Sequence, residues 1–424
     1  MPDRKNKPFF KTSEKIDIKE IKKLIFADNI PVYLLKTGDQ EIIKLDFIFE
    51  AGKIYHKNPL IPEITNILID KGTKNLSSEE ISERFDFYGA YLETEIGKHY
   101  ASVTLYSLNK YFQETFELLF EILFNAVFPE NEIDIYLKNK YQSFLIDIQK
   151  TGTVSSQLFS ETIFGKEHPY GKIIKDIDFK TISKKQIKDF YNTYYLKGNM
   201  FVMFSGKISD SQVSVLKYFL KNTELSQKKI FEPNFNTVLP EPQKVFKKIK
   251  NTVQSSLRVG KVMINKLHPD FFNLNIATII LGGYFGSRLM MNVREDKGYT
   301  YGISAVNISY LRSGFFVIAA ESGNDVYLKA LDEIYKELKQ LRTIPVEFEE
   351  LTRVKKFLYG NLIKIVDGPL ALSEAYKSII SFNLSSEYFY NYLDSVKTIT
   401  PEKLIEISQK YLHEDSMFEV VSGA

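Results

Sequence analysis

The chain has 424 residues, of which 44% are hydrophobic and 26% are charged, and it contains no cysteine. The absence of cysteine excludes disulfides, thiol catalysis and thiolate ligands for a metal ion. The formal net charge is +3 with the two signs interspersed, so the composition predicts no nucleic-acid-binding surface. A chain of this length and hydrophobic content is long enough for two domains with complete cores.

We expect neither a signal peptide nor a membrane-spanning segment. Residues 1–23 are rich in lysine and lack the apolar stretch of a signal peptide. No apolar run reaches the roughly 18 residues that a membrane-spanning helix needs. The sequence therefore predicts a cytoplasmic protein that does not interact with a membrane. The Lys-rich stretches at 19–23 and 244–250 are interpreted as solvated faces or linker.

The first half of the chain predicts an antiparallel-leaning sheet with helices. Apolar residues with a helical period, such as Ile61, Ile64 and Leu68, indicate a helix after two strands. A second helix begins at a capping box at Ser77 and ends at Gly89. In chain order, the predicted elements are strands over 31–35 and 42–49, helices over 61–70 and 77–88, and a hairpin of strands over 91–96 and 100–108.

Two stretches of the chain repeat each other at an offset of 217 residues (397 − 180). Residues 180–206 read KTISKKQIKDFYNTYYLKGNMFVMFSG, and residues 397–423 read KTITPEKLIEISQKYLHEDSMFEVVSG. Each begins with a Ser or Thr helix cap, continues as an amphipathic helix and ends in an apolar strand. Residues 155–171 and 372–388 resemble each other in the same register. A repeat at about half the chain length indicates two copies of one unit.

The predicted fold class is α+β, built from two homologous duplicated domains. Each domain is expected to hold an antiparallel-leaning mixed sheet with helices packed on one side. The boundary is predicted where the sequence is polar, contains proline and shows no period. The predicted divisions are an N-terminal domain over 1–220, a linker over 221–245 and a C-terminal domain over 246–424.

A glycine-rich motif in the second half carries the most specific signal. Residues 281–302 read LGGYFGSRLMMNVREDKGYTYG, which predicts a helix end, an amphipathic helix and a glycine turn into a strand. A phosphate-binding loop is disfavoured because no Lys-Ser or Lys-Thr follows the glycines. The motif resembles the C-terminal-half signature of the pitrilysin/insulinase-type metallopeptidases, which include the mitochondrial processing peptidase subunits. The resemblance extends to residues 51–52, 71–73, 89–90 and 168–171. The last of these are interpreted as a structural turn, with a contact to the substrate as the alternative.

The resemblance implies a role for two residues of this motif. Arg294 and Tyr301 match the Arg/Tyr pair with which the second half of the family contacts the substrate backbone at the scissile peptide bond. A guanidinium and a phenol can donate hydrogen bonds to a carbonyl oxygen or to the charge that develops on it. The alternative is that Arg294 forms an ordinary helix ion pair with Glu295 or Asp296, and that Tyr301 is a packed strand aromatic.

The resemblance also locates the family's zinc motif, which is degenerate in this chain. Active members bind zinc through His-x-x-Glu-His on a first-half helix, where the Glu activates the attacking water. Here Glu63 takes the first His position, Asn66 the position of the catalytic Glu and Ile67 the second His position. Isoleucine offers a metal no lone pair, and asparagine accepts no proton at neutral pH. On the long helix that provides the third ligand, the nearest carboxylate is Asp147.

We therefore predict that this chain binds no metal and catalyses no hydrolysis alone. The resemblance implies a zinc-less, non-catalytic subunit of a heterodimeric zinc metallopeptidase that acts on peptides. A homologous partner subunit would carry the zinc and the His-x-x-Glu-His motif, and Arg294 and Tyr301 would reach the partner's active site. The alternative is a catalytically inactive scaffold, or a peptide-binding chamber protein of the same fold.

Overall fold

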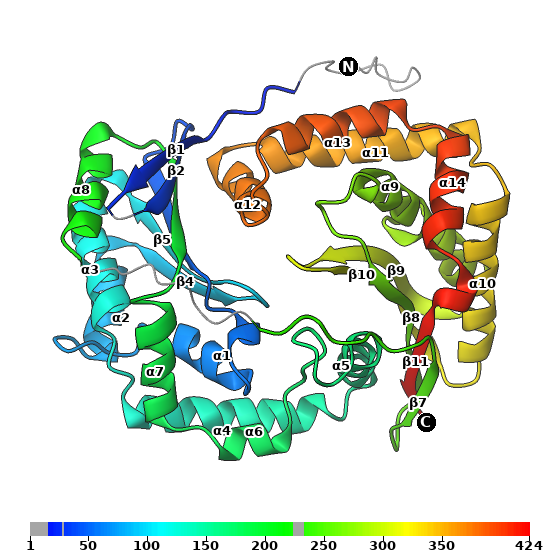
Figure 1. Cartoon of the computed structure of the whole chain (residues 1–424), viewed down its shortest axis with the longest axis horizontal. Coiled ribbons are helices and arrows are strands. Elements are labelled where there is room, and N and C mark those ends of the chain that lie inside the picture. The colour runs from blue at the N-terminus through cyan, green and yellow to red at the C-terminus, as the bar shows by residue number, and fades with distance from the viewer. Residues whose placement is uncertain (1–15, 28, 224–232) are drawn as a thin grey trace, which may run out of the picture.

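A computed structural model describes residues 16–27, 29–223 and 233–424 of the chain. The first half forms a six-stranded sheet with the strand order β1-β2-β6-β3-β5-β4 (Figure 1). Only the β2–β6 pair in this sheet is parallel. Its strands are β1 (Lys22–Phe26), β2 (Ile30–Lys36), β3 (Ile42–Phe49), β4 (Tyr91–Ile96), β5 (Ala101–Leu108) and β6 (Met200–Gly206).

The second half forms a five-stranded sheet with the order β7-β11-β8-β10-β9, in which only the β7–β11 pair is parallel. This order repeats β2-β6-β3-β5-β4 strand for strand. The prediction of two duplicated α+β units with mixed, mainly antiparallel sheets is therefore confirmed. The strands are β7 (Lys244–Lys248), β8 (Gln254–Met263), β9 (Thr300–Ser309), β10 (Gly314–Gly323) and β11 (Phe418–Gly423).

The sequence repeat coincides with repeated structure. Helix α7 and strand β6 of the first half correspond to helix α14 and strand β11 of the second half at the same offset. In both helices the capping side chain, Ser183 or Thr400, accepts a hydrogen bond from the backbone N–H three residues later.

Most of the remaining chain is helical. The first-half helices are α1 (Leu60–Ile67), α2 (Ser78–Tyr88), α3 (Phe112–Asn125), α4 (Glu130–Asp147), α5 (Thr151–Phe164), α6 (Asp176–Lys180), α7 (Lys184–Tyr194) and α8 (Asp210–Lys221). The second-half helices are α9 (Phe271–Gly282), α10 (Tyr327–Thr343), α11 (Phe348–Val366), α12 (Pro369–Ile380), α13 (Glu387–Thr398) and α14 (Pro401–Tyr411). Single turns are η1 (Lys53–Tyr55), η2 (Asn109–Tyr111) and η4 (Glu414–Ser416), and η3 (Met290–Asp296) is a π-helix. None of the described helices combines the length and apolar character needed to cross a membrane.

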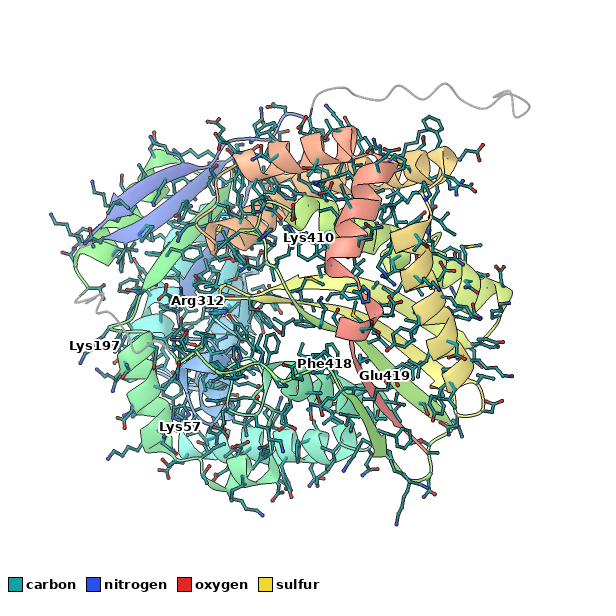
Figure 2. All side chains as sticks on the ribbon, turned by 45° about the vertical axis from the view of Figure 1, so that its right-hand side comes forward. Lys57, Lys197, Arg312, Lys410, Phe418 and Glu419 are labelled. Atoms are coloured by element: carbon teal, nitrogen blue, oxygen red, sulfur yellow. The ribbon has the colours of Figure 1, made fainter. Side chains whose placement is uncertain are left out.

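Each half covers one face of the other half's sheet with a helix. Helix α5 packs on β8 and β11, where Ile163 and Phe164 lie in one apolar cluster with Phe418 (Figure 2). Helix α12 packs on β2 and β6, where Tyr376 and Ile379 lie in a cluster with Met203. The helices are therefore not confined to one side of each sheet. The physical reason is that central strands such as β3 are buried on both faces and need a cover on each.

Polar contacts accompany both of these helix–sheet contacts. The buried hydroxyls of Ser155 and Ser256 lie 2.7 Å apart beneath α5, and Ser205 Oγ donates to Ser373 Oγ at 2.8 Å beneath α12. On β3 the buried Lys44 pairs with Asp46 at 3.0 Å and also with a carboxylate of α12. Because unpaired buried charges are costly, the first sheet needs this helix from the second half.

The lysines of the two Lys-rich stretches are exposed, as expected for solvated faces, but most of them lie in strands rather than in a linker. Part of 19–23 lies in β1, and part of 244–250 forms β7, both at sheet edges. Exposed lysines on edge strands discourage pairing with other chains. They also remove the alternation of apolar and polar residues by which a strand is recognised in a sequence. The linker over 221–245 stays a prediction, and residues 224–232 of it lie outside the described residues.

The contact of α5 with the second sheet should contribute measurably to stability. Replacing the fully buried Ile163 with alanine is expected to lower the free energy of unfolding by about 2–5 kcal/mol, because a cavity remains. The control Ile135→Ala, on the exposed side of α4, should change it by less than about 0.5 kcal/mol. Urea denaturation measures both, and equal effects of the two variants would contradict the packing described.

Candidate functional site

The residue predicted to match the family's first zinc ligand, Glu63, lies in a buried ion-pair cluster. Glu63 lies on α1 and is only 3% exposed. One carboxylate oxygen lies 2.6 Å from Lys53 Nζ, and the other lies 2.5 Å from Lys140 Nζ. The Tyr136 hydroxyl donates a further hydrogen bond to Glu63 at 3.1 Å. The carboxylate at the predicted position of a metal ligand therefore lies between two ammonium groups.

The charge of Glu63 is stabilised by these lysines. Burial alone opposes ionisation of the carboxyl, but the attraction of Lys53 and the hydrogen bonds from Lys140 and Lys53 outweigh it. The pKa of Glu63 consequently lies below its ordinary value. Because both carboxylate oxygens are engaged by cations, a further cation would have to displace a lysine.

The other two motif positions are occupied by packing residues. The Asn66 amide donates to the Glu95 carbonyl at 2.8 Å and accepts from the Tyr195 hydroxyl at 2.8 Å. Burial raises the pKa of Tyr195 well above its ordinary value, so its hydroxyl stays a donor. Ile67 packs against the first apolar core. Asn66 thus bridges a backbone carbonyl and a side-chain hydroxyl at the position predicted from the sequence to match the family's general base.

The long helix α4 reaches Glu63 through Tyr136 and Lys140, which lie one turn apart. Asp147, the carboxylate considered from the sequence, lies at the end of α4 and pairs with Lys150 at 2.8 Å. Within the described ranges, no group of three or more His, Cys, Asp or Glu side chains is placed to hold a metal. The donor set at this position does not fit zinc.

The glycine-rich motif joins the end of α9 to β9 through the π-helix η3. Gly282 is required by close packing, since a Cβ there would lie 2.6 Å from the Ala305 backbone nitrogen. Gly298 adopts a φ of 65°, which allows the turn into β9. The predicted amphipathic helix is thus a π-helix, a rare geometry that is frequent at functional sites.

The two arginines of this motif differ in their surroundings. Arg288 makes a bidentate pair with Glu350 of α11 at 2.9 and 2.8 Å, which anchors the motif to the domain. Arg294 lies over the Phe285 ring at 5.3 Å and approaches Glu295 only to 3.5 Å. The helix ion pair considered for Arg294 therefore exists but is long and partly exposed.

Tyr301 extends into solvent from β9 with 84% of its surface exposed. The interpretation of Tyr301 as a packed strand aromatic is therefore wrong. Its neighbour Thr300 is buried and bonds the β10 backbone, since strand residues alternate between the two faces. Arg294 and Tyr301 are thus positioned on a well-packed scaffold but are not part of its core. Their contact with a substrate stays a prediction.

Residues 168–171 form a structural turn, as interpreted from the sequence. The backbone N–H of Tyr170 donates to His168 Nδ1 at 3.0 Å. The buried Tyr170 hydroxyl lies 2.6 Å from His99 Nε2 and accepts from the backbone N–H of Arg312 at 3.1 Å. Arg312 lies between β9 and β10, so this tyrosine links the two halves (Figure 2).

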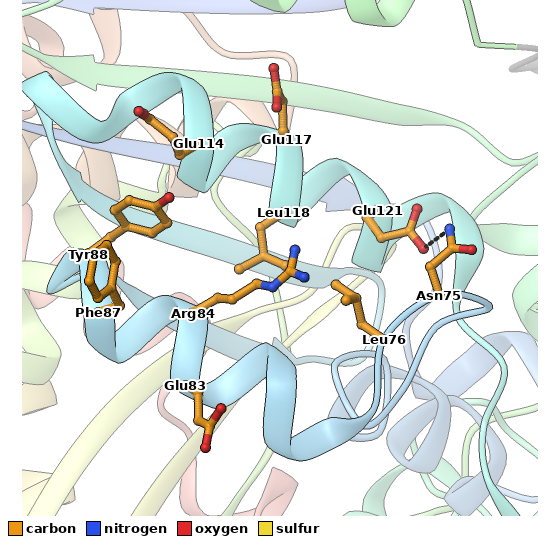
Figure 3. A pocket seen from close by; sticks show the side chains of 10 residues that line it. All are labelled: Asn75, Leu76, Glu83, Arg84, Phe87, Tyr88, Glu114, Glu117, Leu118 and Glu121. Carbon is orange, nitrogen blue, oxygen red and sulfur yellow. Dashed lines mark hydrogen bonds between the residues drawn. The ribbon is translucent and has the colours of Figure 1, made fainter.

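An open groove of about 830 Å³ lies between α2 and α3, apart from both motif positions. Figure 3 shows four carboxylates around it, with Arg84 extending between the helices. The carboxylates belong to Glu83, Glu114, Glu117 and Glu121. Its lining contains Arg84 and the half-buried Tyr88 but no Ser, Thr, His or Cys, and none of the motif residues belongs to it.

Comparison with known proteins agrees with this geometry. Residues 181–358 match the family model described as "Peptidase M16 inactive domain". The chain is 25% identical over 315 residues to "Uncharacterized zinc protease YmxG" of Bacillus subtilis, covering 73% of this chain and 75% of the relative. It is 24% identical over 406 residues to "Non-peptidase homolog YmxG" of Helicobacter pylori, covering 90% and 87%. It is 20% identical over 345 residues to human "Mitochondrial-processing peptidase subunit beta", covering 77% and 68%.

Solved structures share the fold. The peptidase M16 inactive domain from Pseudomonas fluorescens superposes with a TM-score of 0.87 at 21% identity, covering 95% of this chain and 98% of that chain. A protease from Helicobacter pylori superposes with a TM-score of 0.86 at 17% identity, covering 96% and 100%. The fold of this chain is therefore shared with these solved structures over nearly its whole length. Residues 181–358 are, in addition, similar in sequence to an inactive domain of the peptidase M16 family.

The Glu63 cluster predicts a pH-dependent stability. A lowered pKa means that its stabilisation is full above the ordinary glutamate pKa of about 4.3 and is lost as pH falls through the folded-state value. Glu63→Gln should therefore lower the free energy of unfolding by about 2–3 kcal/mol near neutral pH, and the difference from wild type should shrink in acid. Urea denaturation at several pH values measures this. The exposed Glu83→Gln is the control, and a Glu63→Gln effect independent of pH would contradict the cluster.

Zinc binding provides a separate test of the degenerate motif. The isolated chain is expected to bind no stoichiometric zinc, and Ile67→His should not create a tight site, because one nitrogen ligand would stand beside two lysines. Competition with a chromophoric chelator measures the affinity, with the exposed Ile135→His as control. Sub-micromolar zinc binding by the isolated chain or by Ile67→His alone would show that other ligands are already present.

Proposed function

We propose that this chain is the non-catalytic, zinc-less subunit of a heterodimeric peptidase of the M16 family. In this proposal Arg294 and Tyr301 reach the active site of a homologous, zinc-bearing partner and hold the backbone of a peptide substrate. The exposure of Tyr301, within an otherwise tightly packed motif, is the observation that carries the proposal. A side chain that only stabilised the domain would be buried.

The chemistry of the pair suits a developing oxyanion. The Arg294 guanidinium has several planar donors, and the Tyr301 phenol has one. Their backbones are fixed by the π-helix and by β9, so little reorganisation is needed to meet a substrate carbonyl. Stacking over Phe285 limits the positions of the guanidinium while leaving its donors largely available.

The lysine cluster supports the assignment of hydrolysis to a partner. In a zinc peptidase the metal polarises the carbonyl and activates water. Lys53 and Lys140 can neutralise Glu63, but they cannot lower the pKa of a bound water as zinc does. Among the relatives, the human protein is named as one subunit of a processing peptidase, which favours by analogy an assembly of more than one chain.

The second candidate function is a catalytically inactive scaffold or a peptide-binding chamber. The name "Non-peptidase homolog" of the Helicobacter pylori relative favours it. It gives no reason, however, for an exposed Tyr301 on a scaffold that holds Arg288 in a bidentate ion pair. The two functions differ in whether the Arg/Tyr pair affects turnover.

Substitution of the pair distinguishes the two functions in a complex of this chain with its zinc-bearing partner. Tyr301→Phe removes the hydroxyl and keeps the ring, so folding and assembly should be unchanged while peptide turnover falls at least about tenfold. Loss of one donor to an oxyanion typically costs about 10²–10³ in rate. Initial rates of peptide hydrolysis, zinc content and subunit association are measured together.

The exposed Tyr218→Phe on α8 is the matched control and should leave the rate unchanged. If the double variant Arg294→Ala with Tyr301→Phe cleaves peptides at the wild-type rate, the subunit does not contribute these groups, and the scaffold function is favoured.

A further inference from the structure

A small cavity next to the degenerate zinc position is lined by three lysines. Lys53 comes from η1, Lys98 from the turn between β4 and β5, and Lys172 from the segment after the 168–171 turn. The cavity measures about 230 Å³, and α5 closes one side of it. Its described lining includes no Asp or Glu. Three cationic side chains therefore converge on one confined space.

The positive charge of this cavity is only partly neutralised. Lys53 is shared with Glu63, which also binds Lys140. The Lys98 ammonium donates to the Tyr170 carbonyl oxygen at 3.2 Å, and no described carboxylate lies within ion-pair distance of it. A backbone carbonyl satisfies one donor without balancing the charge. The cluster therefore holds excess positive charge on half-buried side chains around this cavity.

Burial and the neighbouring like charges also lower the pKa values of two of these lysines. Burial, together with the like charges of Lys53 and Lys172, lowers the pKa of Lys98 to about 8. Burial also lowers the pKa of Lys172, although Glu167 opposes this, and Lys57 contributes a further like charge. Like charges that are only partly neutralised by Glu63 and Glu167 destabilise the folded chain. An anion in the cavity would remove this cost.

The lining also supplies uncharged hydrogen-bonding groups. Ser156, Gln157 and Ser160 face the cavity from one side of α5, at the spacing of successive helical turns. Two of the three are hydroxyls and the third has an amide N–H₂ group, so they can complement the ammonium groups around an oxyanion. The volume suits a single carboxylate or phosphate group and is too small for a nucleotide.

We propose that this cavity is a binding site for a small oxyanion, held mainly by Lys98 and Lys172 with Lys53 at its edge. The site is separate from the Arg294/Tyr301 pair and does not depend on the proposed subunit function. The ligand chemistry has two sources, which are free inorganic phosphate and the carboxylate of an acidic side chain in a bound peptide. The position next to Glu63 means that Lys53 connects the oxyanion site to the former metal position.

Titration calorimetry on the full chain tests the proposal with two probes. The first is inorganic phosphate, and the second is a pair of peptides that differ only in one Glu or Gln residue. The double variant Lys98→Gln with Lys172→Gln removes the principal cations. The control Lys185→Gln with Lys188→Gln removes the same charge from exposed positions on α7. Thermal unfolding shows whether each variant is folded.

The proposal expects saturable binding of phosphate, or of the Glu peptide over the Gln peptide, by the wild-type chain. The Lys98/Lys172 variant should bind at least about tenfold more weakly, while the α7 control should bind as the wild type does. Phosphate binding without a Glu/Gln difference identifies a free anion as the ligand, and a Glu preference identifies an acidic side chain. Binding that is absent, or equal in the wild type and the Lys98/Lys172 variant, overturns the proposal.

A charge reversal keeps the test informative if the glutamine variants are unstable. Lys98→Glu would place a carboxylate between Lys53 and Lys172, and so would supply the missing negative charge from within the chain. This variant should melt at or above the wild-type temperature in buffer without phosphate, and it should no longer bind either probe. A Lys98→Glu chain that binds phosphate as the wild type does would contradict the site.

Discussion

The structure depends on the mutual covering of two sheets by two exchanged helices. Central strands of both sheets, such as β3, β6 and β11, are buried on both faces. Helix α5 closes the open face of the second sheet, and α12 closes the open face of the first. The buried Lys44–Asp46 pair on β3 is completed by a carboxylate of α12. Because neither sheet is covered by its own half alone, we expect the two duplicated units to fold as one cooperative body.

The two sites predicted from the sequence lie in different halves of the chain and differ in what their residues do. On α1, in the first half, lysines surround Glu63 at the predicted zinc position, and Asn66 and Ile67 make packing and hydrogen-bonding contacts. In the second half, Gly282, Gly298 and Arg288 hold the π-helix and β9 in a defined geometry. That geometry presents a side chain with no packing role. A domain that had lost all function would be expected to lose the geometry of the glycine-rich motif as well as the zinc ligands.

Much of the fold could be predicted from the sequence because the signals were local. The capping box at Ser77, the turn at Gly89 and the hairpin over 91–108 all depend on residues close in sequence, and the structure contains each of them. The duplication was visible because one offset relates the two copies. The strands β1 and β7 were missed, since their exposed lysines have no strand-like alternation.

The remaining features depend on contacts between distant segments, which periodicity does not reveal. An amphipathic helix such as α12 shows that it has an apolar face but not which sheet it covers. Glu63 was recognised as a degenerate ligand, but its partners Lys53 and Lys140 lie on either side of it in the chain, on other elements. The exposure of Tyr301 also follows only from the strand's place in the sheet. A lysine seventy-seven positions after a glutamate (140 − 63) carries no pairwise signal in a single sequence.

The central claim is that the Arg/Tyr pair and the zinc act from different chains. Hydrolysis of a peptide by this chain, by a homologous chain with His-x-x-Glu-His, and by their mixture tests it most directly. Such a partner would first be sought in the adjacent reading frame. The account predicts no turnover by this chain, slow turnover by the zinc-bearing chain, and a rate about 10²-fold higher or more for the mixture. A zinc-bearing chain that is as fast alone as in the mixture would contradict it.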